Sequence, residues 1–179
     1  MSDVDSHASD LAALKALLQQ GLSLSKQGSY ERRLPAAAAL PKLREALNGL
    51  RKLVREEPTA EAWKSLALAE ESLLHYPAAA EALQQAIALS QPPDRKDLKR
   101  LIQVKEYAAK WESIGLTPQT LADLGVYLEN ALTHEPCDHS HRHTRAWLES
   151  RSAKHVTKAI NSLQSVGGCC DCEVLLNVV

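Results

Sequence analysis

Four residues in the last third of the chain have the types and spacing of a metal site. Cys137 and His139 form a C-x-H pair, and Cys170 and Cys172 form a C-x-C pair about thirty residues further on. Thiolate and imidazole are the ligands that zinc takes in its four-coordinate structural sites. We therefore predict one structural zinc ion per chain, bound by these four side chains.

The spacing within each pair is unusually short. One residue separates the two ligands, whereas common zinc motifs leave two to four. Chelation at this spacing requires an extended or turned backbone. Two alternatives stay open: His141 or His143 can replace His139 as the ligand, and Cys170 and Cys172 can be buried thiols or a redox pair.

Acidic residues lie directly beside the four predicted ligands. Asp138, Asp171 and Glu173 have the chemistry of groups that orient a metal-bound histidine through its second ring nitrogen. They are equally compatible with solvated charges, so the sequence leaves both roles open.

Three motifs of this region carry a family resemblance. They are Cys137-Asp138-His139, then Trp147-Leu148, then the run Gly167-Gly168-Cys169-Cys170-Asp171-Cys172-Glu173-Val174. With them, the stretch from Thr117 to Val179 resembles a bacterial family of domains of unknown function, family 2695. That family usually has an aromatic residue where Cys169 stands, so the resemblance implies that Cys169 is not a ligand. It implies no activity.

Helices must position these motifs. Apolar residues recur at helical spacing between Pro and Gly stops, with Thr59 and Thr117 as N-caps. The predicted helices cover residues 10–28, 41–56, 60–74, 77–90, 94–113, 117–134, 144–151 and 153–164. The last segment, Glu173 to Val179, is β-prone, and we expect one short terminal strand there.

Residues 59–93 have the apolar spacing of a helical repeat. Large and then small apolar residues are spaced along two predicted helices, with Trp63, Leu66 and Ala67 on the first and Ala79, Leu83 and Ala86 on the second. Pro58 and Pro92 are 34 residues apart. This pattern and period resemble the tetratricopeptide repeat. An ordinary antiparallel helical bundle is the alternative.

Composition supports an all-α fold. Apolar residues make up 45% of the 179 residues, but aromatic residues only 4%, and Phe is absent. The core must therefore consist mainly of Leu and Ala, both strong helix formers. We expect a disordered N-terminus at 1–9, a domain of antiparallel helical hairpins at 10–115, and a small zinc-clipped helical domain at 116–179.

Charge and hydropathy bear on partners and location. The net charge is −1, with acidic and basic residues spread along the chain, so we expect no nucleic-acid partner. No stretch approaches the roughly 18 apolar residues of a membrane span, and the acidic N-terminus does not have the pattern of a signal peptide. We expect a cytoplasmic protein, where thiols stay reduced and bind metals.

Three classes of function remain. A non-enzymatic adaptor that binds a protein or peptide through its helical hairpins fits a closed, structural zinc site best. A zinc hydrolase would need an open coordination position and an acid/base such as Glu173 or Asp138. A thiol-based redox or metal sensor would use Cys169, Cys170 and Cys172.

Overall fold

The computed structural model describes residues 3–27, 34–151 and 155–179. Within these ranges the chain forms nine helices and no strand, so the predicted all-α class is confirmed. The helices are α1 (Asp3–Ser25), α2 (Leu40–Glu56), α3 (Ala60–Ser72), α4 (Tyr76–Leu89), α5 (Arg95–Ile114), α6 (Pro118–His134), α7 (Arg142–Ser150), α8 (Val156–Ser165) and α9 (Asp171–Asn177). None of these described helices has the length and apolar character that a membrane span requires.

The chain divides into two compact units, Met1–Ala108 and Ala109–Val179. The sequence predicts a boundary between residues 115 and 116, with α5 wholly in the first domain. In the structure, the last turns of α5 belong to the second unit. Helix α1 also begins at Asp3, whereas residues 1–9 were expected to be disordered; Met1 and Ser2 lie outside the described residues.

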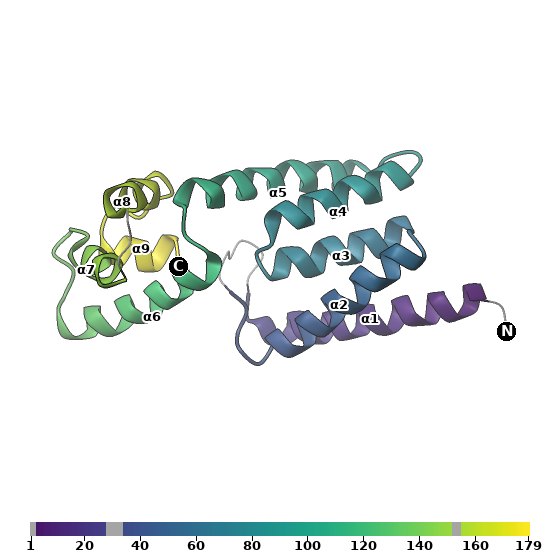
Figure 1. Ribbon diagram of the computed structural model, residues 1–179, viewed down its shortest axis with the longest axis horizontal. Helices are drawn as coiled ribbons and strands as arrows, with labels where there is room; N and C mark the ends of the chain where they lie inside the picture. The colour runs from purple at the N-terminus through teal and green to yellow at the C-terminus, as the bar shows by residue number, and fades with distance from the viewer. Residues whose placement is uncertain (1–2, 28–33, 152–154) are drawn as a thin grey trace. The chain divides into compact units, whose positions relative to one another are not determined.

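In the first unit, consecutive helices run in alternating directions (Figure 1), and α1 to α4 pack each against the next. Thr59 begins α3 as predicted, since its side chain accepts a hydrogen bond from the backbone N–H of Ala62 at 3.2 Å. The core combines leucines with many alanines, which allow helices to approach closely. Its fully buried members include Leu43, Ala46, Leu50, Ala67, Ala79, Leu83 and Ala86.

One carboxylate is buried inside this unit. The side chain of Glu70, on α3, accepts hydrogen bonds from Arg51 Nε at 2.9 Å and from His75 Nδ1 at 2.8 Å. Burial alone would raise the pKa of Glu70, but the hydrogen bonds from His75 and Arg51 outweigh it and lower the pKa below its ordinary value. Glu70 therefore links α2, α3 and the α3–α4 turn as a charged group.

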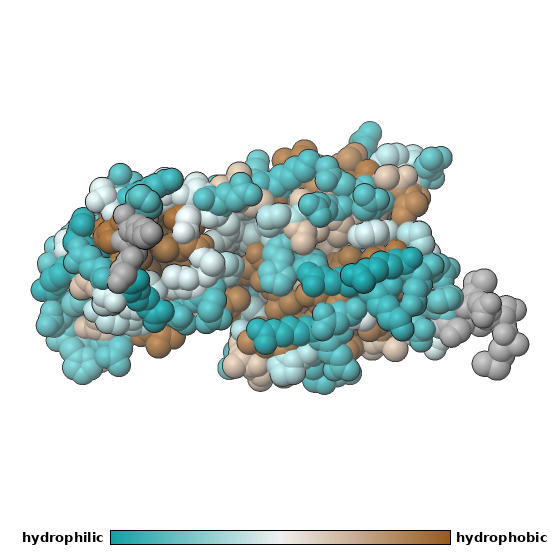
Figure 2. Space-filling view, in the orientation of Figure 1, coloured by the Kyte–Doolittle hydropathy of each residue, from teal (hydrophilic) through white to brown (hydrophobic). Residues whose placement is uncertain are grey.

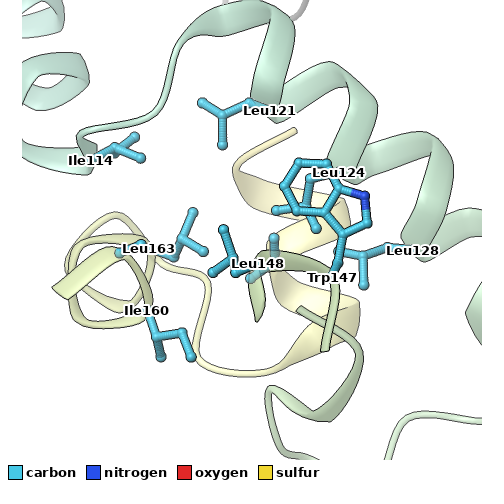
Figure 3. Packing of buried hydrophobic residues seen from close by; sticks show 10 residues of the cluster. Ile114, Leu121, Leu124, Leu128, Trp147, Leu148, Ile160 and Leu163 are labelled. Atoms are coloured by element: carbon cyan, nitrogen blue, oxygen red, sulfur yellow. The ribbon is translucent and has the colours of Figure 1, made fainter. Parts of the chain in front are cut away.

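The second unit has its own apolar core. Leucines on one face of α6 meet Trp147 and Leu148 of α7, with Ile160 and Leu163 of α8 on the other side (Figure 3). Thr117 begins α6 as predicted by accepting a hydrogen bond from the backbone N–H of Thr120 at 3.1 Å. Val174 of α9 is fully buried in the same core.

The predicted terminal strand is wrong. Residues 171–177 form α9, and Val178 N donates to Val174 O at 3.0 Å in the helical pattern. The β-prone residues of this segment are spaced so that Val174 and Val178 share one face of a helix, and Val174 is buried against the core. Packing has therefore overridden local strand propensity.

Candidate metal centre

The first segment of the site is the turn between α6 and α7. Asp138 Oδ1 accepts hydrogen bonds from Ser140 N at 3.1 Å and from Ser140 Oγ at 2.6 Å, which is the pattern of an Asx turn. His139, between them, has a positive φ of 64°. Cys137 therefore lies at the start of this turn, two residues before a residue in the left-handed region.

The second segment begins where α8 ends. Gly167, at a φ of 97°, donates to Gln164 O, and Gly168 donates to Leu163 O at 2.9 Å. These two bonds form a Schellman motif, the helix ending that favours glycine. Cys170 is then extended, with φ −152° and ψ 173°, and precedes the first residue of α9. Cys172 lies in the first turn of that helix.

Asp171 joins the two segments. Its backbone N–H donates to Ser140 O at 2.9 Å. Its carboxylate is fully buried and accepts hydrogen bonds from His143 N at 2.8 Å, Thr144 N at 2.9 Å and Thr144 Oγ1 at 2.6 Å. The N–H groups at the start of a helix have no partner within that helix. Asp171 therefore caps α7 from a distant part of the chain.

The two segments bring three thiols together. The sulfur atoms of Cys137, Cys170 and Cys172 all lie within 4.8 Å of one another, and those of Cys170 and Cys172 are 3.2 Å apart. Cys170 is buried, Cys137 is partly buried and Cys172 is exposed. Two sulfurs bound to one tetrahedral zinc, each at about 2.3 Å, lie roughly 3.8 Å apart. The three thiols fit a zinc-sized ion with small side-chain movements.

The other predicted or alternative ligands lie outside this group among the described residues. His141 Nε2 donates to Gly168 O at 2.8 Å, and His143 Nε2 accepts from Arg142 at 3.2 Å, so both imidazoles have partners elsewhere. His139 is not gathered with the thiols in this structure, and its role as fourth ligand stays a prediction. Cys169 is exposed and stands apart from the three thiols.

Hydrogen bonds make the thiols unequal as acids. The backbone N–H of Cys172, and next that of His139, lower the pKa of the Cys137 thiol, since they stabilise its thiolate. Hydrogen bonding with Cys170 and then with Cys137 raises the pKa of Cys172 to about 12. A metal ion that binds all three as thiolates must displace thiol protons, so its binding depends on pH.

The role of Asp171 is not apparent from the sequence, which is compatible with Asp138, Asp171 and Glu173 as partners of His139 or as solvated charges. Instead, Asp138 holds the Asx turn, Asp171 caps α7, and Glu173 Oε2 accepts from Cys169 N at 3.0 Å at the start of α9. The roles of Asp138 and Glu173 follow local sequence patterns: an Asp just before a turn often accepts hydrogen bonds from that turn, and a Glu in the first turn of a helix often accepts one from the backbone before the helix.

Comparison with known proteins agrees with the resemblance of the C-terminal region. Residues 124–177, from α6 to the end of α9, match the model of the family described as "Protein of unknown function (DUF2695)". An uncharacterized protein of Mycobacterium tuberculosis and one of Mycobacterium bovis are each 33% identical to this chain over 93 residues, which cover 50% of this chain and 93% of the relative. No solved structure matches the chain.

Proposed function

The chain belongs to the DUF2695 family, and we propose that it is a non-enzymatic protein-interaction module whose C-terminal unit is held together by a structural zinc ion. The observation that carries the zinc proposal is the convergence of Cys137, Cys170 and Cys172 from two segments far apart in sequence. An exposed acidic cluster would leave the metal class open, but three thiolates favour a soft or borderline ion such as zinc.

His139 is the proposed fourth ligand. His141 and His143 are engaged with Gly168 and Arg142, whereas no side-chain hydrogen bond of His139 is present among the described residues. A non-glycine residue in the left-handed region costs about 1–2 kcal/mol. Such strain persists where the surroundings impose it, and it is frequent at ligand sites.

The zinc proposal is tested on protein purified under reducing conditions. We expect one zinc per chain by elemental analysis, with loss in Cys137→Ser, Cys170→Ser and Cys172→Ser. Cys169→Ser is the matched control, because its thiol lies outside the group. His139→Ala should weaken zinc retention against a chelator, and His141→Ala should weaken it much less. Zinc-free, reduced and folded protein would contradict the proposal.

The adaptor part of the proposal rests on the first unit. Its helices form hairpins with closely packed alanines at the positions that the repeat pattern indicated, Ala67, Ala79 and Ala86. We propose that these hairpins are tetratricopeptide-like and present one face to a protein or peptide partner in the cytoplasm. The carboxylates that a hydrolase would use, Asp138 and Glu173, accept local backbone hydrogen bonds, which favours the structural role.

A second candidate function is redox sensing, favoured by the 3.2 Å separation of the Cys170 and Cys172 sulfurs. A peroxide would oxidise two thiols to one disulfide, with the peroxide oxygens reduced to water, and the bound metal would be released. Mass spectrometry of the peroxide-treated protein, with zinc release followed in parallel, tests this candidate. A site that keeps its zinc while the exposed Cys169 is oxidised would exclude it.

A further inference from the structure

The part of α5 that belongs to the first unit exposes apolar side chains to solvent. Leu98 is 40% exposed and Ile102 is 61% exposed, although other large side chains of this helix, such as Val104, are buried. Leu98 and Ile102 are four residues apart and so share one face. In Figure 2, brown apolar atoms interrupt the teal surface over α5.

Basic side chains surround this apolar pair. Arg95, Lys99 and Lys105 are exposed, and each lies three residues from Leu98 or Ile102, which places it beside that residue on the helix surface. In the part of the chain that the structure describes, none of these three cations has a carboxylate within ion-pair distance. Exposed Asp94 and Glu106, four residues from Leu98 and Ile102 respectively, bound the face at its two ends.

Two cations between α5 and α3 are neutralised. Arg100 pairs with Glu71 at 2.6 Å, and Lys64 of α3 pairs with Asp97 at 2.6 Å. The exposed side of α5 carries more cations than carboxylates, and its three cations beside Leu98 and Ile102 have no ion pair among the described residues. The chain as a whole carries a net charge of only −1, so this positive face is a local feature.

We infer that the α5 face formed by Arg95, Leu98, Lys99, Ile102 and Lys105 binds an acidic amphipathic helix of a partner protein. The inference rests on the proposed interaction function and names its partner class. Apolar residues four apart on the partner would cover Leu98 and Ile102, and flanking carboxylates would pair with the three cations. A second copy of the same face would bring like charges together.

Nucleic acid and membrane fit this face less well. Phosphate binding would use the cations but would leave Ile102 without a role, and the nearby aromatic Tyr107 is packed against Tyr76 at 5.5 Å. Interfacial membrane helices bury a wider apolar face than two aliphatic residues.

The test uses the full, zinc-loaded chain and a fluorescein-labelled synthetic helical peptide with leucines four apart and glutamates beside them. A peptide of the same composition, scrambled so that its leucines share no face, measures the purely electrostatic part. Ile102→Ser and Leu98→Ser remove the apolar contact, and Lys99→Glu with Lys105→Glu reverses the charge. Val126→Ser, at a residue 69% exposed on α6, and Lys158→Glu, at an exposed lysine of α8, are the matched controls.

We expect the patterned peptide to bind at least fivefold tighter than the scrambled one. Ile102→Ser should weaken it about tenfold, equal to about 1.4 kcal/mol, and the double charge reversal should weaken it further. Added salt should weaken binding to the unsubstituted chain, and the control variants should behave like it. Equal binding of both peptides, no binding, or tighter binding of a DNA duplex or of phosphatidylserine vesicles through the same residues would overturn the inference.

The same samples separate the two levels of proposal. Zinc content and circular dichroism are measured on every variant, and these substitutions at exposed positions should alter neither. If zinc is present and the patterned peptide binds all the α5 variants as tightly as the unsubstituted chain, the adaptor proposal stands and the assignment to α5 is wrong. If zinc is absent and the patterned peptide still binds through Ile102, the zinc proposal fails and the inference stands.

Discussion

Replacing Asp171 with asparagine should destabilise the C-terminal unit by about 3 kcal/mol. The carboxylate accepts three hydrogen bonds at 2.6–2.9 Å from His143 and Thr144, and Asp171 and Thr144 are fully buried. An amide of the same shape turns an NH₂ group toward one of these donors. Loss of a helix cap costs about 0.5–2 kcal/mol, and loss of a hydrogen bond to a charged group costs about 1.5–3 kcal/mol. These contributions overlap, which gives the estimate.

The change should be visible in thermal unfolding and in hydrogen exchange. For a unit of 60–100 residues, each kcal/mol shifts Tm by about 4–8 °C, so we expect a decrease of roughly 12–24 °C. The amides of His143 and Thr144 should exchange much faster in the variant, while α3 and α4 keep their protection. Since Asp171 lies between Cys170 and Cys172, zinc affinity should also fall, by roughly 10–100-fold.

Asp138→Asn is the matched control for Asp171→Asn. Asp138 is in the same site, but its side chain is half-exposed and its hydrogen bonds go to Ser140 within its own turn. We expect a much smaller loss of stability than for Asp171→Asn, as for most surface substitutions. If Asp171→Asn unfolds within about 0.5 kcal/mol of the unsubstituted protein, or if the two variants are equally destabilised, the buried cap does not contribute as argued.

Three further predictions concern single residues. Cys170→Ser should release the zinc and lower the Tm of the C-terminal unit, whereas Cys169→Ser should change neither, as followed by elemental analysis and calorimetry. Glu70→Gln should lower stability in urea unfolding by about 1–2 kcal/mol at pH 7. The pKa of Glu70 is lowered from 4.5, so its stabilising effect is present above that value and disappears as the pH falls through the lowered pKa; the difference between variant and parent should vanish in acid. Gly168→Ala should cost about 1–3 kcal/mol of stability, because the added methyl would lie 2.8 Å from a Val174 methyl group. A variant as stable as the parent would show that α9 can shift away from Gly168 without cost.

Most helices of this protein could be predicted from their ends. Thr59 and Thr117 cap the helices that follow them, and the prolines at 58 and 92 lie in the connections that the pattern required. These signals act within a few residues and are therefore readable from sequence. The terminal segment has no such signal: its β-prone residues are helical because Val174 packs into a core formed by distant helices.

The candidate site was predictable only in part, for the same reason. The three thiols could be found because their residue type is rare and clustered, and metal chemistry restricts what such clusters do. The cap formed by Asp171 could not be found, since it joins residues 27 and 28 positions apart in sequence. Cap preferences describe a residue directly before its own helix. Asp171 instead caps α7, which lies more than twenty residues earlier in the chain.

The short C-x-C spacing is explained by where α9 begins. Cys170 is extended and Cys172 lies in the first helical turn, so the backbone changes conformation between the two ligands, at Asp171. The hydrogen bonds that hold Asp171 against Ser140 and the start of α7 therefore also fix the relative position of the two thiols and their distance from Cys137. A metal bound by these thiols and the buried cap would stabilise the same arrangement. The metal and the Asp171 cap should consequently stabilise each other, and loss of either one should destabilise α7 and α9 together.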